Sequence, residues 1–333
     1  MRFLVLALLV GCGPKGPVVA AGSQPVVPAG EVAPPRTKEA PVAEPMTHDW
    51  IDVPRYRVTA GDLELAVFDT GGDGEPVVFV HGMGSTSAFW QQQLTGGRLE
   101  GYRLVALDLP GWGDSSQPDA AYTPSFYAKA VLAAMDALGL ERAHVVAHSM
   151  GGQAAIVLTV EHPERVRSLT LSAPAGVETF TPEEGTAIRA FWASQDLANR
   201  TEDQARVGYQ FAFARWDDDV EKLLQARMAL AGTEQIDGLV RATRSSVDGM
   251  LDEPVIDRLG ELSVPVAYVY GTQDMMIPAR AVHPDQTPAS IAKRAQDAIP
   301  GVSVHALDGA GHTPHHDAPE AFDAVLREFL EAH

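Results

Sequence analysis

The sequence predicts a doubly wound α/β fold with a mostly parallel sheet and an inserted helical cap. Short apolar runs rich in β-branched residues alternate with amphipathic helical stretches along most of the chain, which is the pattern of parallel strands joined by crossover helices. The alternation stops at about residues 177–260, where helical stretches follow one another without a convincing buried strand. A helical insertion of this length between two strands predicts a cap over the sheet.

Composition supports a folded core and argues against polyanionic partners. Of the 333 residues, 45% are hydrophobic and 21% are charged, as in ordinary globular proteins. The 44 acidic residues outnumber the 25 basic ones and give a formal net charge of -19. Because such a surface repels phosphate backbones and anionic lipid headgroups, we expect no nucleic-acid partner.

The first residues predict a secretory signal. A basic start precedes an apolar run from Phe3 to Val10, which is too short to span a bilayer but typical of a signal peptide. The stretch LVGC that ends at Cys12, the single cysteine of the chain, resembles the bacterial lipobox. This resemblance implies that residues 1–11 are a lipoprotein signal peptide and that Cys12 carries a lipid. An ordinary signal peptide with a chance cysteine is the alternative.

The lipobox resemblance also implies a location. The protein would be anchored in the bacterial cell envelope through Cys12 alone, and Gly13 in the next position favours the outer membrane. Residues 12–47 are rich in proline, glycine and alanine. Because proline lacks an N–H donor and forces extended neighbours, we predict a tether there and a single folded domain over residues 48–333.

The elements of this domain are predicted from residue 56 onward. An antiparallel hairpin opens the sheet, with six parallel strands after it, since β-branched runs bounded by turn residues are typical of strands. The expected hairpin strands are Tyr56–Thr59 and Leu63–Asp69, and the parallel strands are Pro76–Val80, Leu104–Leu107, His144–Ala147, Leu169–Leu171, Val266–Tyr270 and Val302–Leu307.

Helices are predicted from their capping residues and apolar periodicity. Thr123 and Pro124 begin a helix over Ser125–Leu138, because threonine caps a helix and proline fits its first turn. Other helices are expected from residue 150 to His162, from Ala318 toward Leu330 and, within the cap, over Thr186–Leu197, Glu202–Arg215 and Val220–Ala231. The cap aromatics Tyr209, Phe211, Phe213 and Trp216 are interpreted as packing rather than as a pocket lining.

A candidate nucleophile lies in the stretch AHSMG, which contains Ser149. The stretch follows a predicted strand, opens a predicted helix and matches the nucleophile elbow in spacing, with Ala147 in place of the first glycine. Small residues are needed two positions before and after the serine because their backbones approach closely. The pattern therefore predicts Ser149 as the attacking residue.

A second glycine-rich turn follows the strand that ends at Val80. Gly82 and Gly84 would let the chain turn so that the backbone amide of Met83 faces the serine and forms an oxyanion hole with the amide of Met150. We expect His81 to hold this loop by hydrogen bonds rather than to act as a base.

The acid and the base are predicted from two later strand ends. Asp274 follows the strand Val266–Tyr270, at the sheet edge where α/β folds place their catalytic groups; a turn-capping aspartate is the alternative. His312 lies on a glycine-rich loop after the last strand. Asp308 and Asp317 compete for the acid role, but a carboxylate from a separate strand end suits it better.

Three histidines in this loop, His312, His315 and His316, also raise the alternative of a metal site. Pro314 interrupts the helical spacing that such ligands need, and no further ligand is evident. We therefore predict neither a metal nor a cofactor.

The chain order Ser149, Asp274, His312 is that of one serine-hydrolase architecture. With the stretch DLPGWGDS over residues 108–115, the chain resembles the α/β-hydrolase superfamily from about residue 50 to 333, in the cap-bearing group of esterases, enol-lactonases and carbon-carbon bond hydrolases. It departs from that group at Ala147 and in an apparent insertion over Ala281–Pro288.

This resemblance implies hydrolysis of a carboxylic ester or lactone through an acyl-enzyme intermediate, with a small-molecule acyl substrate. A carbon-carbon bond hydrolase of the same fold is the alternative within the class. A catalytically silent, lipid-tethered binding protein is the alternative from another class. The sequence carries no indication of the oligomeric state.

Overall fold

The computed structural model describes residues 43–333. The predicted signal peptide, Cys12 and most of the predicted tether lie outside the described residues. Between residues 43 and 333, the helices are too short or too polar to cross a membrane.

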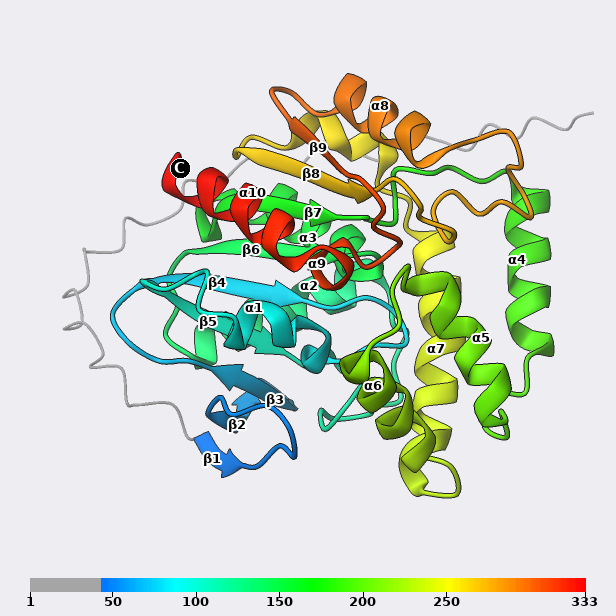
Figure 1. Ribbon diagram of the computed structural model, residues 1–333, viewed down its shortest axis with the longest axis horizontal. Coiled ribbons are helices and arrows are strands. Elements are labelled where there is room, and N and C mark those ends of the chain that lie inside the picture. The colour runs from blue at the N-terminus through cyan, green and yellow to red at the C-terminus, as the bar shows by residue number, and fades with distance from the viewer. Residues whose placement is uncertain (1–42) are drawn as a thin grey trace, which may run out of the picture. The chain divides into compact units, whose positions relative to one another are not determined.

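The core is a nine-stranded sheet in the order β1-β2-β3-β5-β4-β6-β7-β8-β9 (Figure 1). The strands are β1 (Ala43–Met46), β2 (Arg55–Ala60), β3 (Leu63–Asp69), β4 (Glu75–Val80), β5 (Tyr102–Leu107), β6 (Ala143–His148), β7 (Val166–Ser172), β8 (Val266–Gly271) and β9 (Ser303–Leu307). The pairs from β5 through β9 are parallel, and the first three strands add an antiparallel edge. The predicted mostly parallel sheet and its leading hairpin are confirmed.

The edge strand β1 lies inside the stretch predicted as a tether, residues 12–47. Its residues pair antiparallel with β2, from Ala43 opposite Val58 to Met46 opposite Arg55. Pro45 does not prevent this pairing, because an edge strand leaves one side of its backbone without a partner. The chain therefore joins the sheet before residue 48.

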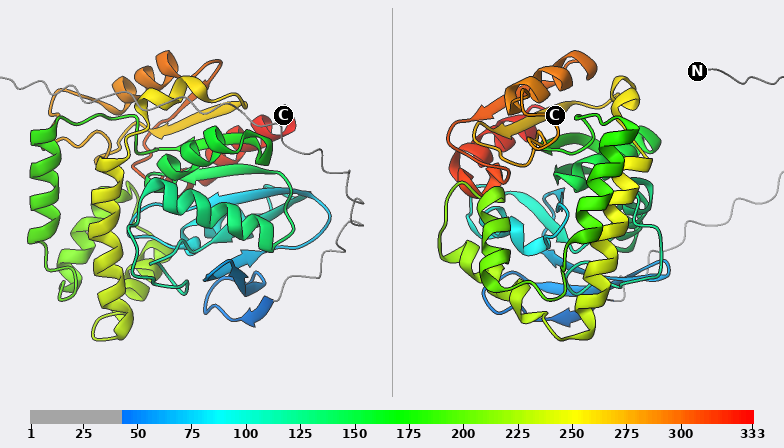
Figure 2. Two further views of the ribbon diagram at one scale, coloured as in Figure 1. Left: turned by 180° about the vertical axis from the view of Figure 1, so that it is seen from behind. Right: turned by 90° about the vertical axis from the view of Figure 1, so that its right-hand side faces the viewer.

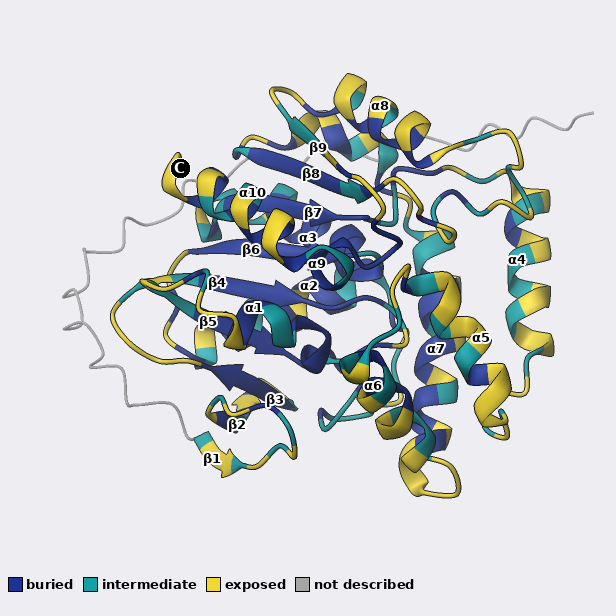
Figure 3. Cartoon of the chain, viewed as in Figure 1, coloured by how far each residue is buried: buried dark blue, intermediate teal, exposed yellow. Residues whose placement is uncertain are grey.

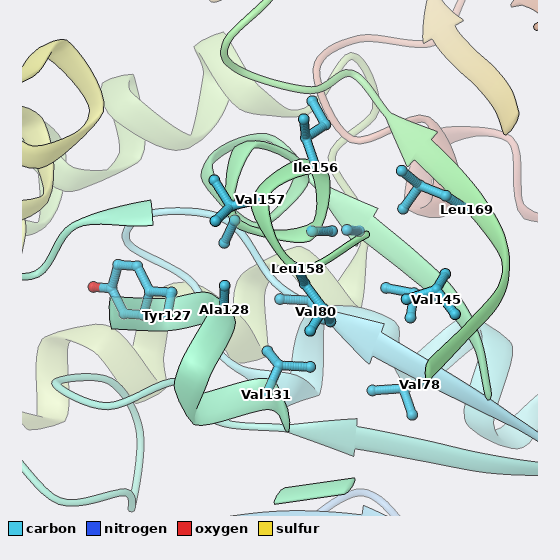
Figure 4. Packing of buried hydrophobic residues seen from close by; sticks show 14 of the residues in the cluster. Val78, Val80, Tyr127, Ala128, Val131, Val145, Ile156, Val157, Leu158 and Leu169 are labelled. Atoms are coloured by element: carbon cyan, nitrogen blue, oxygen red, sulfur yellow. The ribbon is translucent and has the colours of Figure 1, made fainter. Parts of the chain in front are cut away.

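Helices cover both faces of the sheet. They are α1 (Gln91–Thr95), α2 (Pro124–Ala137), α3 (Met150–Glu161), α8 (Pro288–Ala298), α9 (Pro314–Asp317) and α10 (Pro319–Glu331). Strand β4 shows why two layers form, since Val78 and Val80 belong to one hydrophobic cluster and Val77 and Phe79 to the other. Figure 4 shows side chains of the first cluster, where α2 and α3 pack on the strands.

The cap lies beyond the carboxyl ends of the strands (Figures 1 and 2). It consists of α4 (Pro182–Ser194), α5 (Glu202–Ala212), α6 (Asp218–Ala229) and α7 (Glu234–Asp252), inserted between β7 and β8. The sequence did not single out α7. Two of the cap aromatics pack as expected, since Tyr209 and Phe213 stack with ring centroids 5.8 Å apart and Phe213 is buried. Phe211 differs, because 46% of it is exposed.

Candidate active site

The predicted nucleophile lies at a sharp turn between β6 and α3. Ser149 has φ 51° and ψ -120°, a left-handed backbone conformation that a side chain other than glycine rarely adopts. Glycine is required at position 151, two residues after Ser149, because a Cβ atom there would lie 2.4 Å from the His81 carbonyl oxygen. Ala147 is fully buried, so the turn accommodates alanine in place of the usual glycine.

The structure brings the three predicted catalytic side chains together. The Nε2 atom of His312 lies 3.0 Å from the Ser149 Oγ, and its Nδ1 atom lies 2.9 Å from the Asp274 Oδ2. Asp274 and His312 are 1% and 3% exposed. With Nδ1–H donating to the carboxylate, Nε2 is free to accept the serine proton.

The acid is also held by its own loop. The second carboxylate oxygen of Asp274 accepts hydrogen bonds from the amides of Met276 at 2.8 Å and Ile277 at 2.9 Å. These bonds fix the carboxylate that orients His312. The competing Asp308 instead accepts from the Thr272 hydroxyl at 3.1 Å and is exposed.

Asp317, the other competitor, joins the histidine loop to the cap. One of its oxygens accepts from the amides of Gly311 at 2.8 Å and Ala214 at 3.1 Å, and the other accepts from the amide of Arg215 at 3.2 Å. Burial raises the pKa of Asp317, and the three amide bonds oppose that shift. This carboxylate therefore positions two chain segments and does not contact His312.

The loop after β4 has the contacts expected of an oxyanion loop. His81 is fully buried, accepts from the amide of Leu109 at 2.9 Å through Nε2 and donates to the Gly82 carbonyl oxygen at 2.8 Å through Nδ1. Burial lowers the pKa of His81, so it stays neutral in this structural role. Within residues 43–333, the amides of Met83 and Met150 donate to no other group and remain available to an oxyanion.

Two further buried histidines lie near the His312 loop: His148 contacts His312, and His315 packs against His148. The ring of His148 donates from Nε2 to the His312 carbonyl oxygen at 2.8 Å and lies 4.9 Å from the ring of His315. His315 stacks on Trp90 with ring centroids 4.1 Å apart. Burial holds the pKa values of both histidines well below the ordinary value. The sequence did not identify His148, because only the fold brings it to the histidine loop.

His315 and His316, which were considered as metal ligands in the sequence, both contact protein side chains instead. His316 lies 3.3 Å from the Asp217 carboxylate through Nε2, while His315 packs against Trp90. From residue 43 onward, no group of three or more His, Cys, Asp or Glu side chains is arranged to hold a metal ion.

The segment predicted as an insertion, Ala281–Pro288, meets the start of the cap. The buried Glu178 carboxylate accepts from the Ala279 amide at 2.9 Å and from the Nδ1 atom of His283 at 2.5 Å. Burial raises the pKa of Glu178, and His283 opposes that shift. Since Glu178 and His283 lie 105 residues apart, this contact could not be predicted from the sequence.

Known proteins are similar to this chain in sequence. At 31% identity over 78% of this chain, it is similar to the dihydrolipoyllysine-residue acetyltransferase component of the acetoin cleaving system of Cupriavidus necator, of whose length it spans 64%. It is 26% identical, over 87% of its length and 99% of the relative, to the 2-hydroxy-6-oxononadienedioate/2-hydroxy-6-oxononatrienedioate hydrolase of Paraburkholderia phymatum.

A solved structure agrees with the fold. The chain superposes with a TM-score of 0.69 on 2-hydroxy-6-oxo-6-phenylhexa-2,4-dienoate hydrolase from Rhodococcus sp. strain RHA1, at 22% identity and over 87% of this chain and 99% of that one. The sequence profile of the alpha/beta hydrolase fold matches residues 75–319. The sheet order, the elbow and this match together show that the chain belongs to the alpha/beta hydrolase fold family.

Proposed function

We propose that this hydrolase cleaves a carboxylic ester or lactone through an acyl-enzyme intermediate, with Ser149 as the nucleophile. The observation that carries the proposal is the continuous hydrogen-bonded path from Ser149 through His312 to Asp274, at a strained turn beside two free amides. Nucleophile, base and orienting acid lie within hydrogen-bond reach of one another, as acyl transfer requires.

The reaction follows from these positions. The Ser149 oxygen attacks the carbonyl carbon while His312 accepts the serine proton, and Asp274 stabilises the imidazolium. The amides of Met83 and Met150 would hold the oxyanion; loss of one such donor costs about 2.7 to 4 kcal/mol of barrier. His312 then gives its proton to the leaving alcohol, and a water molecule deprotonated by the same histidine releases the acid.

A fluorophosphonate labelling experiment tests this proposal. Intact-mass analysis of the wild-type protein should show one adduct, which is absent in Ser149→Ala and forms slowly in His312→Ala. The matched control Ser125→Ala, on the half-buried first turn of α2, should label like wild type. A folded wild-type protein without an adduct would contradict the proposal and favour the silent binding protein.

Carbon-carbon bond hydrolysis is the second candidate, and the Paraburkholderia phymatum relative favours it by name. The same serine hydrolase fold would act there on a vinylogous diketone. The two candidates are separated by comparing p-nitrophenyl esters with a dienol substrate whose strong absorbance disappears on cleavage. Turnover of the dienol with no turnover of any ester would replace the ester proposal with this one.

We also propose that the protein is lipidated at Cys12 and held in the bacterial cell envelope, with the outer membrane favoured. The lipobox-like stretch that ends at Cys12 and the proline-rich stretch after it support this proposal. Cells fed labelled palmitate should yield a labelled membrane-bound protein, and Cys12→Ser should be unlabelled. A labelled Cys12→Ser protein would show that the lipid is elsewhere.

A further inference from the structure

The residue before the nucleophile makes a contact that the proposed reaction does not use. His148 is the last residue of β6, a strand whose six residues are all buried (Figure 3). Its Nε2 atom donates a hydrogen bond to the backbone carbonyl oxygen of His312 at 2.8 Å. The chain segment that carries Ser149 therefore also contacts the backbone of the catalytic base.

The partner of this bond determines the protonation state of His148. A carbonyl oxygen can only accept a hydrogen bond, so Nε2 carries the proton and, in a neutral ring, Nδ1 carries none. Burial, with charge repulsion from His312 and His81, holds the pKa of His148 well below its ordinary value. His148 is therefore a neutral N–H donor at neutral pH, and it adds no positive charge beside His312 when His312 accepts the serine proton.

The ring of His148 is held in this orientation by its neighbours. A Cβ atom on Gly82 would lie 2.9 Å from the Nδ1 atom of His148, so this glycine of the oxyanion loop leaves space for the ring. The rings of His312 and His315 also contact it, each with its centroid 4.9 Å from that of His148. Close packing of this kind restricts rotation of the ring and fixes the direction of its N–H bond.

The backbone carbonyl of His312 has a single hydrogen-bond donor in the part of the chain that the structure describes, and this donor is His148. His312 follows Gly309 and Gly311, and glycine restricts the chain less than any other residue. Ser149 contacts the same histidine through its side chain, with Oγ 3.0 Å from Nε2. Two consecutive residues, His148 and Ser149, therefore contact both the backbone and the ring of the base.

We propose that His148 is a positioning residue for the base: its hydrogen bond to the His312 carbonyl oxygen keeps the His312 ring within reach of Ser149. This role rests on the proposed ester hydrolysis. Proton transfer requires the base within about 2.6 to 3.2 Å of the hydroxyl oxygen, and a displacement of about 1 Å can cost about 100-fold in rate. Without the donor, the carbonyl oxygen would lose its partner inside the protein, and we expect the loop to move.

Steady-state kinetics of the full chain on p-nitrophenyl acetate tests this role. His148→Phe keeps an aromatic ring and removes the donor, so kcat should fall by about 10- to 100-fold. KM should stay within about three-fold of wild type, because a buried ring that does not touch the substrate contributes nothing to its binding. His148→Gln places an amide N–H at a similar reach and should restore kcat to within about five-fold of wild type.

His144→Phe is the matched control. His144 lies on the same strand, is fully buried and contacts the Ser168 hydroxyl through Nδ1 at 2.7 Å. Urea unfolding should show that both phenylalanine variants are destabilised, because each loses a buried hydrogen bond. Only His148→Phe should lose activity, while His144→Phe should keep kcat within about two-fold of wild type. If the phenyl ring prevents folding in His148→Phe, the smaller His148→Leu removes the donor without overpacking.

Proton NMR gives a readout that does not depend on turnover. The His312 Nδ1 proton lies in the hydrogen bond to Asp274, with 2.9 Å between the heavy atoms, and should give a resolved low-field signal in wild type. We expect this signal to shift or broaden in His148→Phe, because the His312 ring is displaced. It should remain in His148→Gln and in His144→Phe.

The outcomes distinguish this inference from the proposed function. If wild type hydrolyses the ester and His148→Phe is equally active, the inference fails and ester hydrolysis stands. Equal losses of kcat in His148→Phe and His148→Gln, or in His148→Phe and His144→Phe, would also overturn the inference, since the donor would then have no specific role. If wild type hydrolyses no ester but the NMR signal changes as expected, the proposed function fails and His148 still positions His312. If wild type shows neither hydrolysis nor the signal, both fail.

Discussion

Helices α3 and α4 have almost the same length, 12 and 13 residues, but opposite surroundings. Ten residues of α3 are buried, and its first residue directly follows Ser149. In α4 only Gly185 is buried. Its attachment to α7 uses exposed ion pairs from Arg189 to Asp248 and Asp252.

The difference shows how the molecule divides its tasks. Around α3, backbone atoms approach so closely that glycine is required, which holds the serine and the oxyanion loop in one geometry. Around α4, few contacts constrain the side chains, so apolar residues remain exposed. We infer that the proposed chemistry depends on the packed region around α3. The choice of substrate would depend on the loosely packed region around α4.

The largest expected effect concerns the catalytic acid, which belongs to the packed region. Asp274→Asn should lower kcat by about 10⁴-fold, because an amide no longer stabilises the correct tautomer of His312. Asp308→Asn should change kcat by less than about three-fold, since this exposed carboxylate contacts Thr272 and not the base. Steady-state kinetics with one activated ester compares the two. Equal losses would show that Asp308 shares the acid role.

A pair of helical glycines compares the two regions directly. In Gly151→Ala the new Cβ atom would lie 2.4 Å from the His81 carbonyl oxygen, so the oxyanion loop must move. We expect the free energy of unfolding to fall by about 2 to 3 kcal/mol and kcat by about 100-fold. In Gly185→Ala the nearest atom, on Leu251, is 3.9 Å away, and the better helix propensity should add about 0.5 to 1 kcal/mol.

Urea unfolding of both glycine variants, with kcat on a short ester, checks this comparison. If both substitutions destabilise the protein alike, α4 is as tightly constrained as α3 and the proposed division of tasks is wrong.

The next largest effect is the pH dependence of the free energy of unfolding, which arises in the packed region. Burial, with charge repulsion from neighbouring histidines, keeps the pKa values of His148 and His315 well below the ordinary value. The unfolded chain therefore binds more protons below about pH 6.5, and stability present above that pH is lost as pH falls. Each histidine should remove about 2 kcal/mol of the unfolding free energy by pH 5.

His315→Phe tests this dependence, because a phenyl ring can still stack on Trp90. Urea unfolding at pH 7 and pH 5 should show a loss about 2 kcal/mol smaller in this variant than in wild type. The matched control is His162→Gln, at a partly exposed position in the turn after α3, which should keep the wild-type dependence. An unchanged dependence in His315→Phe would mean that His315 is protonated in the folded state.

The sequence predicted the packed region better than the cap, and for a physical reason. Ser149, Asp274 and His312 each follow a parallel strand, so the sheet alone brings them to one edge. Runs of β-branched residues also located the strands, and the elbow motif and Pro163 located the two ends of α3. For these elements, the local sequence pattern is sufficient to predict their place in the fold.

Contacts between distant segments could not be predicted in this way. The Asp317 carboxylate binds amides 102 and 103 residues away, and backbone amides have no sequence signature. The exposure of Phe211 beside the buried Phe213 depends on how α5 is placed, which alternating aromatics do not reveal. The sequence therefore predicted the triad but not the contacts that place the cap around it.

The smallest expected effect concerns the ion pairs of α4. Arg189→Ala should lower the free energy of unfolding by about 0.5 kcal/mol, because Asp248 and Asp252 are 55% and 67% exposed and water screens both pairs. In the packed region, Arg55→Ala would leave the Asp108 carboxylate, 0% exposed, without its partner at 2.7 Å, at a cost of about 3 to 5 kcal/mol. Urea unfolding at low salt and in 0.5 M salt separates the cases, since salt should remove most of the Arg189 effect and little of the Arg55 effect. A large, salt-insensitive loss in Arg189→Ala would mean that α4 is held as firmly as the strands. The region around α4 would then not be loosely packed, and the contrast with α3 would be wrong.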